Sequence, residues 1–82
     1  MKQMLFAIKD QLSTFKQPFI LPNDRVAERE FKAIVNDKNS GMYYAPNYFD
    51  LYHIGHFDNE TGKLERIEPK LICNGAAVLE KE

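Results

Sequence analysis

The chain has little cysteine and no strong excess of charge of either sign. Cys73 is the only cysteine among the 82 residues, so no internal disulfide can form, and no group of Cys and His residues has zinc-ligand spacing. Both features are typical of proteins in a reducing compartment. The formal net charge of -1 provides no general attraction to nucleic acid. Binding to a polyanion would therefore need a local cluster of basic side chains.

Long apolar runs and phosphate-binding glycine motifs are also missing. No stretch approaches the roughly 18 apolar residues of a membrane span, and the apolar stretch near residues 4–8 lacks the cleavage pattern of a signal peptide. The glycines match neither the G-x-x-x-x-G-K nor the G-x-G-x-x-G spacing. We therefore expect a cytosolic protein with no membrane association, no cofactor and no small-molecule substrate.

The chain does contain enough apolar material for one small domain over residues 1–82. Hydrophobic residues make up 44% of the sequence and charged residues 28%, which argues against disorder of the whole chain. Residues 3–9 are predicted to form a buried strand. Residues 13–21 are predicted to form an irregular connection, because Pro18 and Pro22 push the preceding residues to extended geometry.

A β-hairpin is the clearest signal in the second half of the chain. Aromatic and β-branched residues dominate residues 49–57, an Asp/Asn-rich turn ends at Gly62, and a second strand covers residues 63–68, up to Pro69. In the register that this turn favours, apolar side chains meet on both faces of the hairpin. The predicted pairs are Phe57 with Leu64, Ile54 with Ile67, His56 with Glu65, and Gly55 with Arg66.

A helix is predicted to begin after Pro22 and to end near residue 37 or 38. Asn23 is a good N-cap, and the apolar residues Ala27, Phe31, Ile34 and Val35 recur with the period of one helical face. After an aromatic-rich loop at residues 42–48 and the hairpin, a strand is predicted at residues 71–73, followed by a helical turn that Asn74 could cap. Val78 and Leu79 would also suit an edge strand. The predicted class is α+β: a short antiparallel sheet, made of the N-terminal strand and the hairpin, packed on one amphipathic helix.

No residue pattern indicates catalysis. His53 and His56 are three positions apart in a predicted strand, so we expect their side chains on opposite faces, where they cannot form one metal site. Cys73 has no base nearby in the sequence and is better explained as a small buried apolar residue. We therefore predict no catalytic residue, no metal ligand and no enzymatic activity. Convergence of His53, His56 and Cys73 on one pocket would reverse this prediction.

Basic and aromatic residues are the candidates for a nucleic-acid site. Arg25, Arg29 and Lys32 lie on the solvent side of the predicted helix and could bind phosphates. Bases could stack on loop tyrosines, namely Tyr43, Tyr44 and Tyr48. Each feature has a structural alternative. A helix is normally charged opposite its core, and loop tyrosines often cover a core edge or form an interface between identical chains.

Several short pieces also occur in a characteristic order: Gln17-Pro18-Phe19, the helix residues Arg25, Ala27 and Phe31, then Asn36-Asp37, Tyr43, Pro46, Tyr48, Leu51, Gly55-His56-Phe57-Asp58 and Thr61-Gly62-Lys63-Leu64. In this order and spacing the chain resembles the small nonstructural protein of gokushovirus-type microviruses, which are tailless phages with circular single-stranded DNA genomes. The resemblance covers nearly the whole chain, and residues 71–82 match only loosely.

The resemblance implies an accessory protein made in the cytoplasm of an infected bacterium, with a role in genome replication or in production and packaging of single-stranded DNA. It brings no established binding residues, although Arg25 matches the pattern. Our first hypothesis is a non-enzymatic single-stranded DNA-binding protein that forms a homodimer. The alternative is an adaptor that docks on a phage replication or capsid protein, or on a host factor, without touching DNA.

Overall fold

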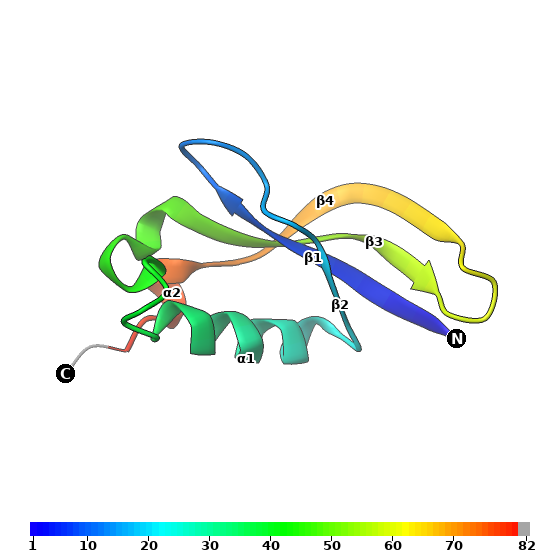
Figure 1. Cartoon of the computed structure of the whole chain (residues 1–82), viewed down its shortest axis with the longest axis horizontal. Coiled ribbons are helices and arrows are strands. Elements are labelled where there is room, and N and C mark those ends of the chain that lie inside the picture. Colours follow the sequence, from blue (N-terminus) through cyan, green and yellow to red (C-terminus); the bar gives the residue numbers. More distant parts are fainter. Residues whose placement is uncertain (81–82) are drawn as a thin grey trace.

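The computed structural model describes residues 1–80 and contains one four-stranded antiparallel sheet with the order β2-β1-β3-β4 (Figure 1). Helix α1 lies against one face of this sheet, which confirms the predicted α+β class. The strands are β1 (Lys2–Asp10), β2 (Phe19–Leu21), β3 (Phe49–Asp58) and β4 (Leu64–Asn74). The helices are α1 (Asp24–Val35), η1 (Met42–Tyr44), η2 (Pro46–Tyr48) and α2 (Gly75–Val78).

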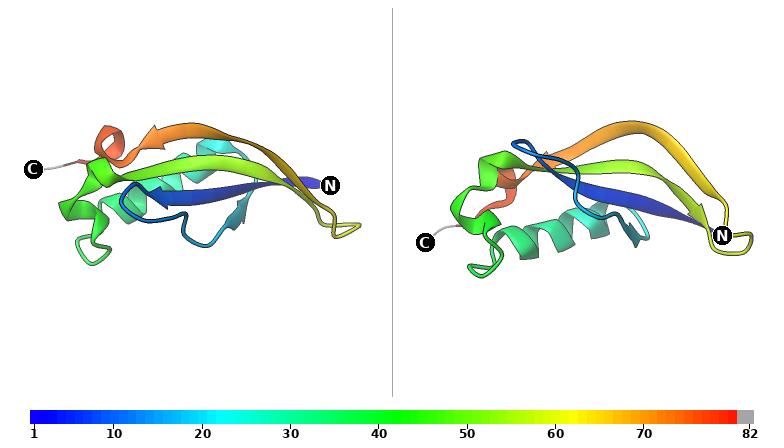
Figure 2. Two further views of the ribbon diagram at one scale, coloured as in Figure 1. Left: turned by 90° about the horizontal axis from the view of Figure 1, so that it is seen from above. Right: turned by 45° about the horizontal axis from the view of Figure 1, so that its top comes forward.

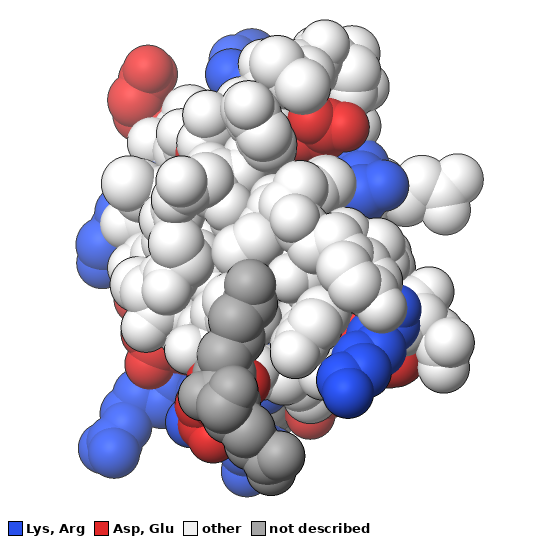
Figure 3. Space-filling view, turned by 90° about the vertical axis from the view of Figure 1, so that its left-hand side faces the viewer, with Lys and Arg blue, Asp and Glu red and all other residues white. Residues whose placement is uncertain are grey.

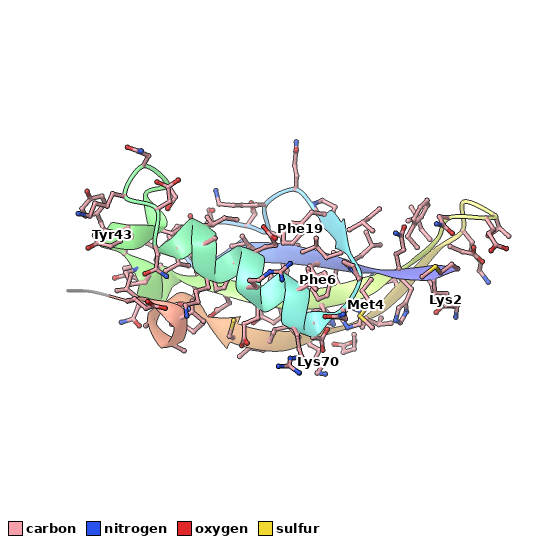
Figure 4. All side chains as sticks on the ribbon, turned by 90° about the horizontal axis from the view of Figure 1, so that it is seen from below. Lys2, Met4, Phe6, Phe19, Tyr43 and Lys70 are labelled. Carbon is pink, nitrogen blue, oxygen red and sulfur yellow. The ribbon has the colours of Figure 1, made fainter. Side chains whose placement is uncertain are left out.

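Helix α1 begins where the sequence predicts and ends slightly earlier. The Asn23 side chain accepts a hydrogen bond of 2.9 Å from the Val26 N–H, as expected of an N-cap. The last helical residue is Val35, a few residues before the predicted end. The buried face of α1 consists of Ala27, Phe31 and Val35, whereas Ile34 is partly exposed. Figure 4 shows Met4, Phe6 and Phe19 of the sheet beneath this helix.

The hairpin register is confirmed near the turn and is wrong farther along the ribbon. Gly62 has a φ of 77°, the left-handed conformation that the turn sequence predicts. The predicted partners of Phe57, His56 and Gly55 are all confirmed. The predicted Ile54–Ile67 pair is not formed, because the register shifts between His53 and Gly55. His53 instead pairs with Lys70, so residues 67–69 bulge out of β4 opposite Ile54.

The expectation that His53 and His56 lie on opposite faces is wrong, because β3 has a bulge of its own at Ile54. Against β1, Gly55 pairs with Leu5 and His53 pairs with Phe6, so Ile54 is an extra residue in β3. One extra residue restores the same face for side chains three positions apart. The two imidazole centroids are accordingly only 5.1 Å apart.

Two further predictions about strands are wrong for reasons of local geometry. Residues 19–21 form a short edge strand, β2, where we expected irregular chain, and Pro18 and Pro22 flank it on both sides. β4 continues through Pro69 to Asn74 instead of stopping there, so the strand predicted at residues 71–73 is confirmed but belongs to β4. A proline is tolerated because β4 lies at the edge of the sheet and Pro69 falls in the bulge, where no ladder hydrogen bond is needed. Asn74 does cap α2, as predicted, by accepting a hydrogen bond from the Ala76 N–H.

The sheet has one face covered by α1 and one face that no helix within residues 1–80 covers. Because side chains alternate along a strand, β1 directs Phe6 and Ile8 toward α1. The same alternation directs other side chains away from α1, and the face that they form is called the open face here. Figure 2 looks onto this open face in its left panel, where β4, β3 and β1 run side by side in front of α1. The open face is formed by Leu5, Ala7 and Lys9 of β1 and by Tyr52 and Ile54 of β3.

The close approach of β3 to β4 at Gly55 predicts that a larger residue there destabilises the protein. A Cβ atom at this position would clash with the backbone carbonyl oxygen of Glu65. We expect Gly55→Ala to destabilise the protein by about 1–3 kcal/mol, as overpacking does elsewhere, measured by urea unfolding. Gly41→Ala is the matched control, because Gly41 has a φ of 81° but no atom within 4 Å of its added Cβ. A smaller loss for Gly55→Ala than for Gly41→Ala would contradict the packing argument.

Candidate nucleic-acid interface

The basic side chains predicted to bind phosphates lie on the exposed side of α1, but carboxylates lie beside two of them. Arg29 Nη2 is 3.9 Å from Glu30 Oε1, and Lys32 Nζ forms an ion pair with the Glu80 carboxylate. Within residues 1–80, Arg25 forms no ion pair. We call Arg25, Arg29 and Lys32 the α1 basic stripe. Exposed ion pairs are weak, yet each one places a negative charge where a phosphate would have to bind.

A groove of about 630 Å³ runs between the α1 basic stripe and α2. Its walls contain Glu28 and Glu80 together with the three basic residues. A phosphate that entered this groove would therefore meet charges of both signs, which reduces the net attraction.

The predicted tyrosines lie beyond the C-terminal end of α1. The rings of Tyr43 and Tyr44 meet edge to face, with centroids 5.1 Å apart, and Tyr44 is 71% exposed. Tyr48 is on η2, and Lys38 Nζ lies 5.8 Å from the Tyr43 ring centroid. Arg25 is in the first turn of a helix of 12 residues, which spans about 18 Å. The structure therefore separates the tyrosines from the strongest basic candidate (Figure 4).

The end of the molecule that carries η1, η2 and α2 has few charged side chains on its surface. Seen from this end, the described surface is mostly uncharged, and basic and acidic side chains are scattered around its edge (Figure 3). The described part of this surface shows no continuous basic patch. A nucleic-acid backbone would find only isolated cations here.

A second group of aromatic and basic side chains lies on the open face of the sheet. The rings of Phe15 and Tyr52 meet edge to face, with centroids 5.5 Å apart. Lys9 Nζ lies 5.5 Å from the Phe15 ring centroid, and Phe15 is 41% exposed. A partly exposed ring beside a lysine combines a stacking surface with a cation at one place.

A groove of about 310 Å³ crosses the open face next to these rings. Its lining is apolar except for one lysine and one arginine, and it includes no carboxylate. This charge pattern differs from that of the groove beside α1. The lining residues are Phe15, Lys16 and Pro18 from the loop before β2, Ala7 and Ile54 from the central strands, and Arg66, Ile67 and Pro69 from β4.

A buried carboxylate anchors the loop between β1 and β2. Asp50 is 8% exposed, and its two oxygens accept hydrogen bonds from Gln11 Nε2 at 2.8 Å and from Asn74 Nδ2 at 2.7 Å. Farther along the loop, the Lys16 N–H donates to the Ile8 carbonyl oxygen at 2.8 Å. The loop is therefore tied to the sheet on both sides of Phe15, which fixes the position of that ring.

The site residues predicted from the sequence do not include Lys9, Phe15, Tyr52 or Arg66. One signal could have found them, because the predicted hairpin register places apolar residues on both faces. A two-layer domain needs only one apolar sheet face for its core. The second apolar face of the predicted hairpin therefore indicated a surface that could bind a ligand or a partner.

His53 is buried near the N-terminus of α1, whereas His56 is partly exposed. His53 Nε2 lies 3.0 Å from the Gly55 carbonyl oxygen, and the His53 ring packs 5.2 Å from Phe6. His53 Nδ1 is 3.9 Å from Asp24 Oδ1. Among residues 1–80 no group of three or more His, Cys, Asp and Glu side chains is arranged to hold a metal ion. These contacts are those of a packed core histidine.

The Cys73 thiol is a weak nucleophile at neutral pH. Burial, together with the nearby carboxylates of Glu28 and Asp50, raises the pKa of its thiol to about 11. The thiol is therefore protonated at neutral pH, and the nucleophilic thiolate is scarce.

Comparison with known proteins supplies one match. A family model described as Phage ORF5 protein matches residues 3–78, which is nearly the whole chain. No curated protein and no solved structure gives a significant match. Within residues 1–80, every helix falls short of the length and apolar character that a membrane crossing requires.

The raised pKa of Cys73 predicts slow alkylation. At pH 8 the native thiol should react with iodoacetamide at least about ten-fold more slowly than the same thiol in denaturant, because an unfolded cysteine titrates near 8.5. The reaction can be followed by intact-mass spectrometry of the full chain. Equal rates in the native and denatured states would show that Cys73 is accessible and ionised, contrary to the burial described here.

Proposed function

The chain belongs to the Phage ORF5 protein family, and from this premise we propose that it is a non-enzymatic accessory protein that binds single-stranded DNA. The binding would serve phage genome replication, or the production and packaging of a single-stranded genome. We propose further that the phage is a gokushovirus-type microvirus and that the protein acts in the cytoplasm of the infected bacterium. The resemblance to the small nonstructural protein of these phages supports both steps.

The observation that carries this proposal is the repeated contact between lysines and aromatic rings. Three such pairs are present: Lys9 with Phe15, Lys16 with Phe49, and Lys38 with Tyr43, with Nζ-to-centroid distances of 5.5, 5.9 and 5.8 Å. Proteins that bind single strands combine rings that stack bases with cations that contact phosphates. With a net charge of -1, the chain can attract a polyanion only through such local groups.

Single strands fit this arrangement better than duplex DNA does. The bases of a duplex are paired and stacked inside the helix, so surface rings cannot reach their faces, whereas the bases of a single strand are available. A homodimer would double the number of contacts along one strand, and we propose this assembly for the same reason.

An adaptor role is the second candidate, and a specific observation favours it. Several large apolar side chains are exposed, including Leu12 at 76% and Leu64 at 67%. Such side chains could dock on a phage replication protein, a capsid protein or a host factor without DNA contact. The two functions differ in whether the isolated protein binds DNA.

Salt-dependent binding tests the DNA-binding proposal. Fluorescence polarisation with a labelled oligo(dT) should show binding at low salt, and log K should fall against log salt with a slope of about -0.7 for each neutralised phosphate. An oligonucleotide duplex of equal length is the control and should bind more weakly, because its bases cannot stack on protein rings. No binding to oligo(dT) at about 20 mM salt would contradict the proposal and favour the adaptor.

A further inference from the structure

We infer that single-stranded DNA binds on the open face of the sheet, with bases against the groove between Phe15 and β4 and phosphates near Lys9 and Arg66. This inference rests on the proposed function and assigns that function to a surface that excludes the α1 basic stripe.

The shape and lining of the groove suit unstacked bases. The volume of about 310 Å³ is bounded by Phe15 and Pro18 on one side and by Ile67 and Pro69 on the other. Flat apolar surfaces and one partly exposed ring favour stacking, and stacking is tolerant of sequence because every base has a π-face. The Tyr52 ring, in edge contact with Phe15, extends the aromatic surface along β3.

The charge of the open face is complementary to a polyanion. Arg66 lines the groove, Lys9 lies over the Phe15 ring, and no carboxylate contributes to the lining. Asp50 pairs with Lys9 in the β1–β3 ladder, but its oxygens are occupied by hydrogen bonds from Gln11 and Asn74. Within residues 1–80, neither Lys9 nor Arg66 forms an ion pair, so both cations can interact with phosphates.

The groove is also fixed before any ligand arrives. The Lys16 N–H donates to the Ile8 carbonyl oxygen, and Lys9 and Phe15 form an isolated β-bridge, so the loop wall is held against β1. The opposite wall belongs to β4, which is paired with β3 on either side of the bulge. A site whose walls are already ordered loses little conformational entropy on binding.

A second copy of the chain is a less suitable occupant of this face. In a two-fold interface the same patch meets itself, so the cations Lys9 and Arg66 of both copies would be brought into one interface. Like charges brought together without counterions oppose association. Single-stranded DNA supplies the missing negative charges together with surfaces that can stack.

Matched charge reversals test the location of the site. Two double variants change the net charge equally, on opposite faces of the molecule. The first combines Lys9→Glu with Arg66→Glu, and the second combines Arg25→Glu with Arg29→Glu. By fluorescence polarisation with oligo(dT), we expect the first pair to weaken binding at least about ten-fold and the second by less than about three-fold. Circular dichroism of each variant checks that the fold is retained. An equal or larger loss for the α1 variant would overturn the inference while leaving DNA binding intact.

An uncharged variant separates stacking from electrostatics. Phe15→Leu keeps an apolar side chain but removes the ring, and it should weaken oligo(dT) binding about five-fold or more without changing the salt slope. Unchanged affinity for Phe15→Leu would overturn the stacking role of this face. If the wild-type protein binds no oligo(dT) at low salt, the proposed function itself fails, and binding of an acidic peptide to the same face becomes the outcome to measure.

Discussion

The close passage of β3 and β4 at Gly55 is the constraint on which the rest of the structure depends. Ile54 is an extra residue with respect to β1, and residues 67–69 bulge from β4 at the same level. Only a residue without a Cβ fits against the Glu65 carbonyl oxygen there. β4 arches across the top of the molecule (Figure 1), and beyond the bulge it returns to α1, where Lys70 Nζ lies 3.5 Å from Asp24 Oδ2. The irregularity also decides which side chains of β3 face the core and which face solvent.

This division of the sheet gives the two faces different roles. The inner face provides Phe6 and Leu51 to a core that α1 completes. The outer face keeps apolar and aromatic side chains that no helix covers, with Lys9 and Arg66 beside them. The α1 basic stripe has more cations but also has Glu28 and Glu80 in the same groove. For a chain with a net charge of -1, the separation of cations from carboxylates matters more than the number of cations.

Local sequence chemistry was sufficient for the elements that depend on local interactions. The Asn23 cap, the left-handed Gly62 and the pairs next to the turn all follow from residues close in the chain. β2 and the continuation of β4 through Pro69 depend on tertiary pairing, which overrides the prolines beside or within them. The candidate site was missed for the same reason. Phe15 and Tyr52 are distant in sequence, and only the β1–β3 ladder and the anchored loop bring their rings together.

In the proposed function, one face of the sheet packs on the core and the other binds a single strand of DNA. The most direct test is an NMR titration of the ¹⁵N-labelled full chain with oligo(dT), which reports every backbone amide at once. We expect the largest chemical-shift changes at Ala7, Phe15, Tyr52, Ile54 and Arg66, with small changes along α1. Changes concentrated on Arg25, Arg29 and Lys32, or spread evenly over both faces, would contradict the account.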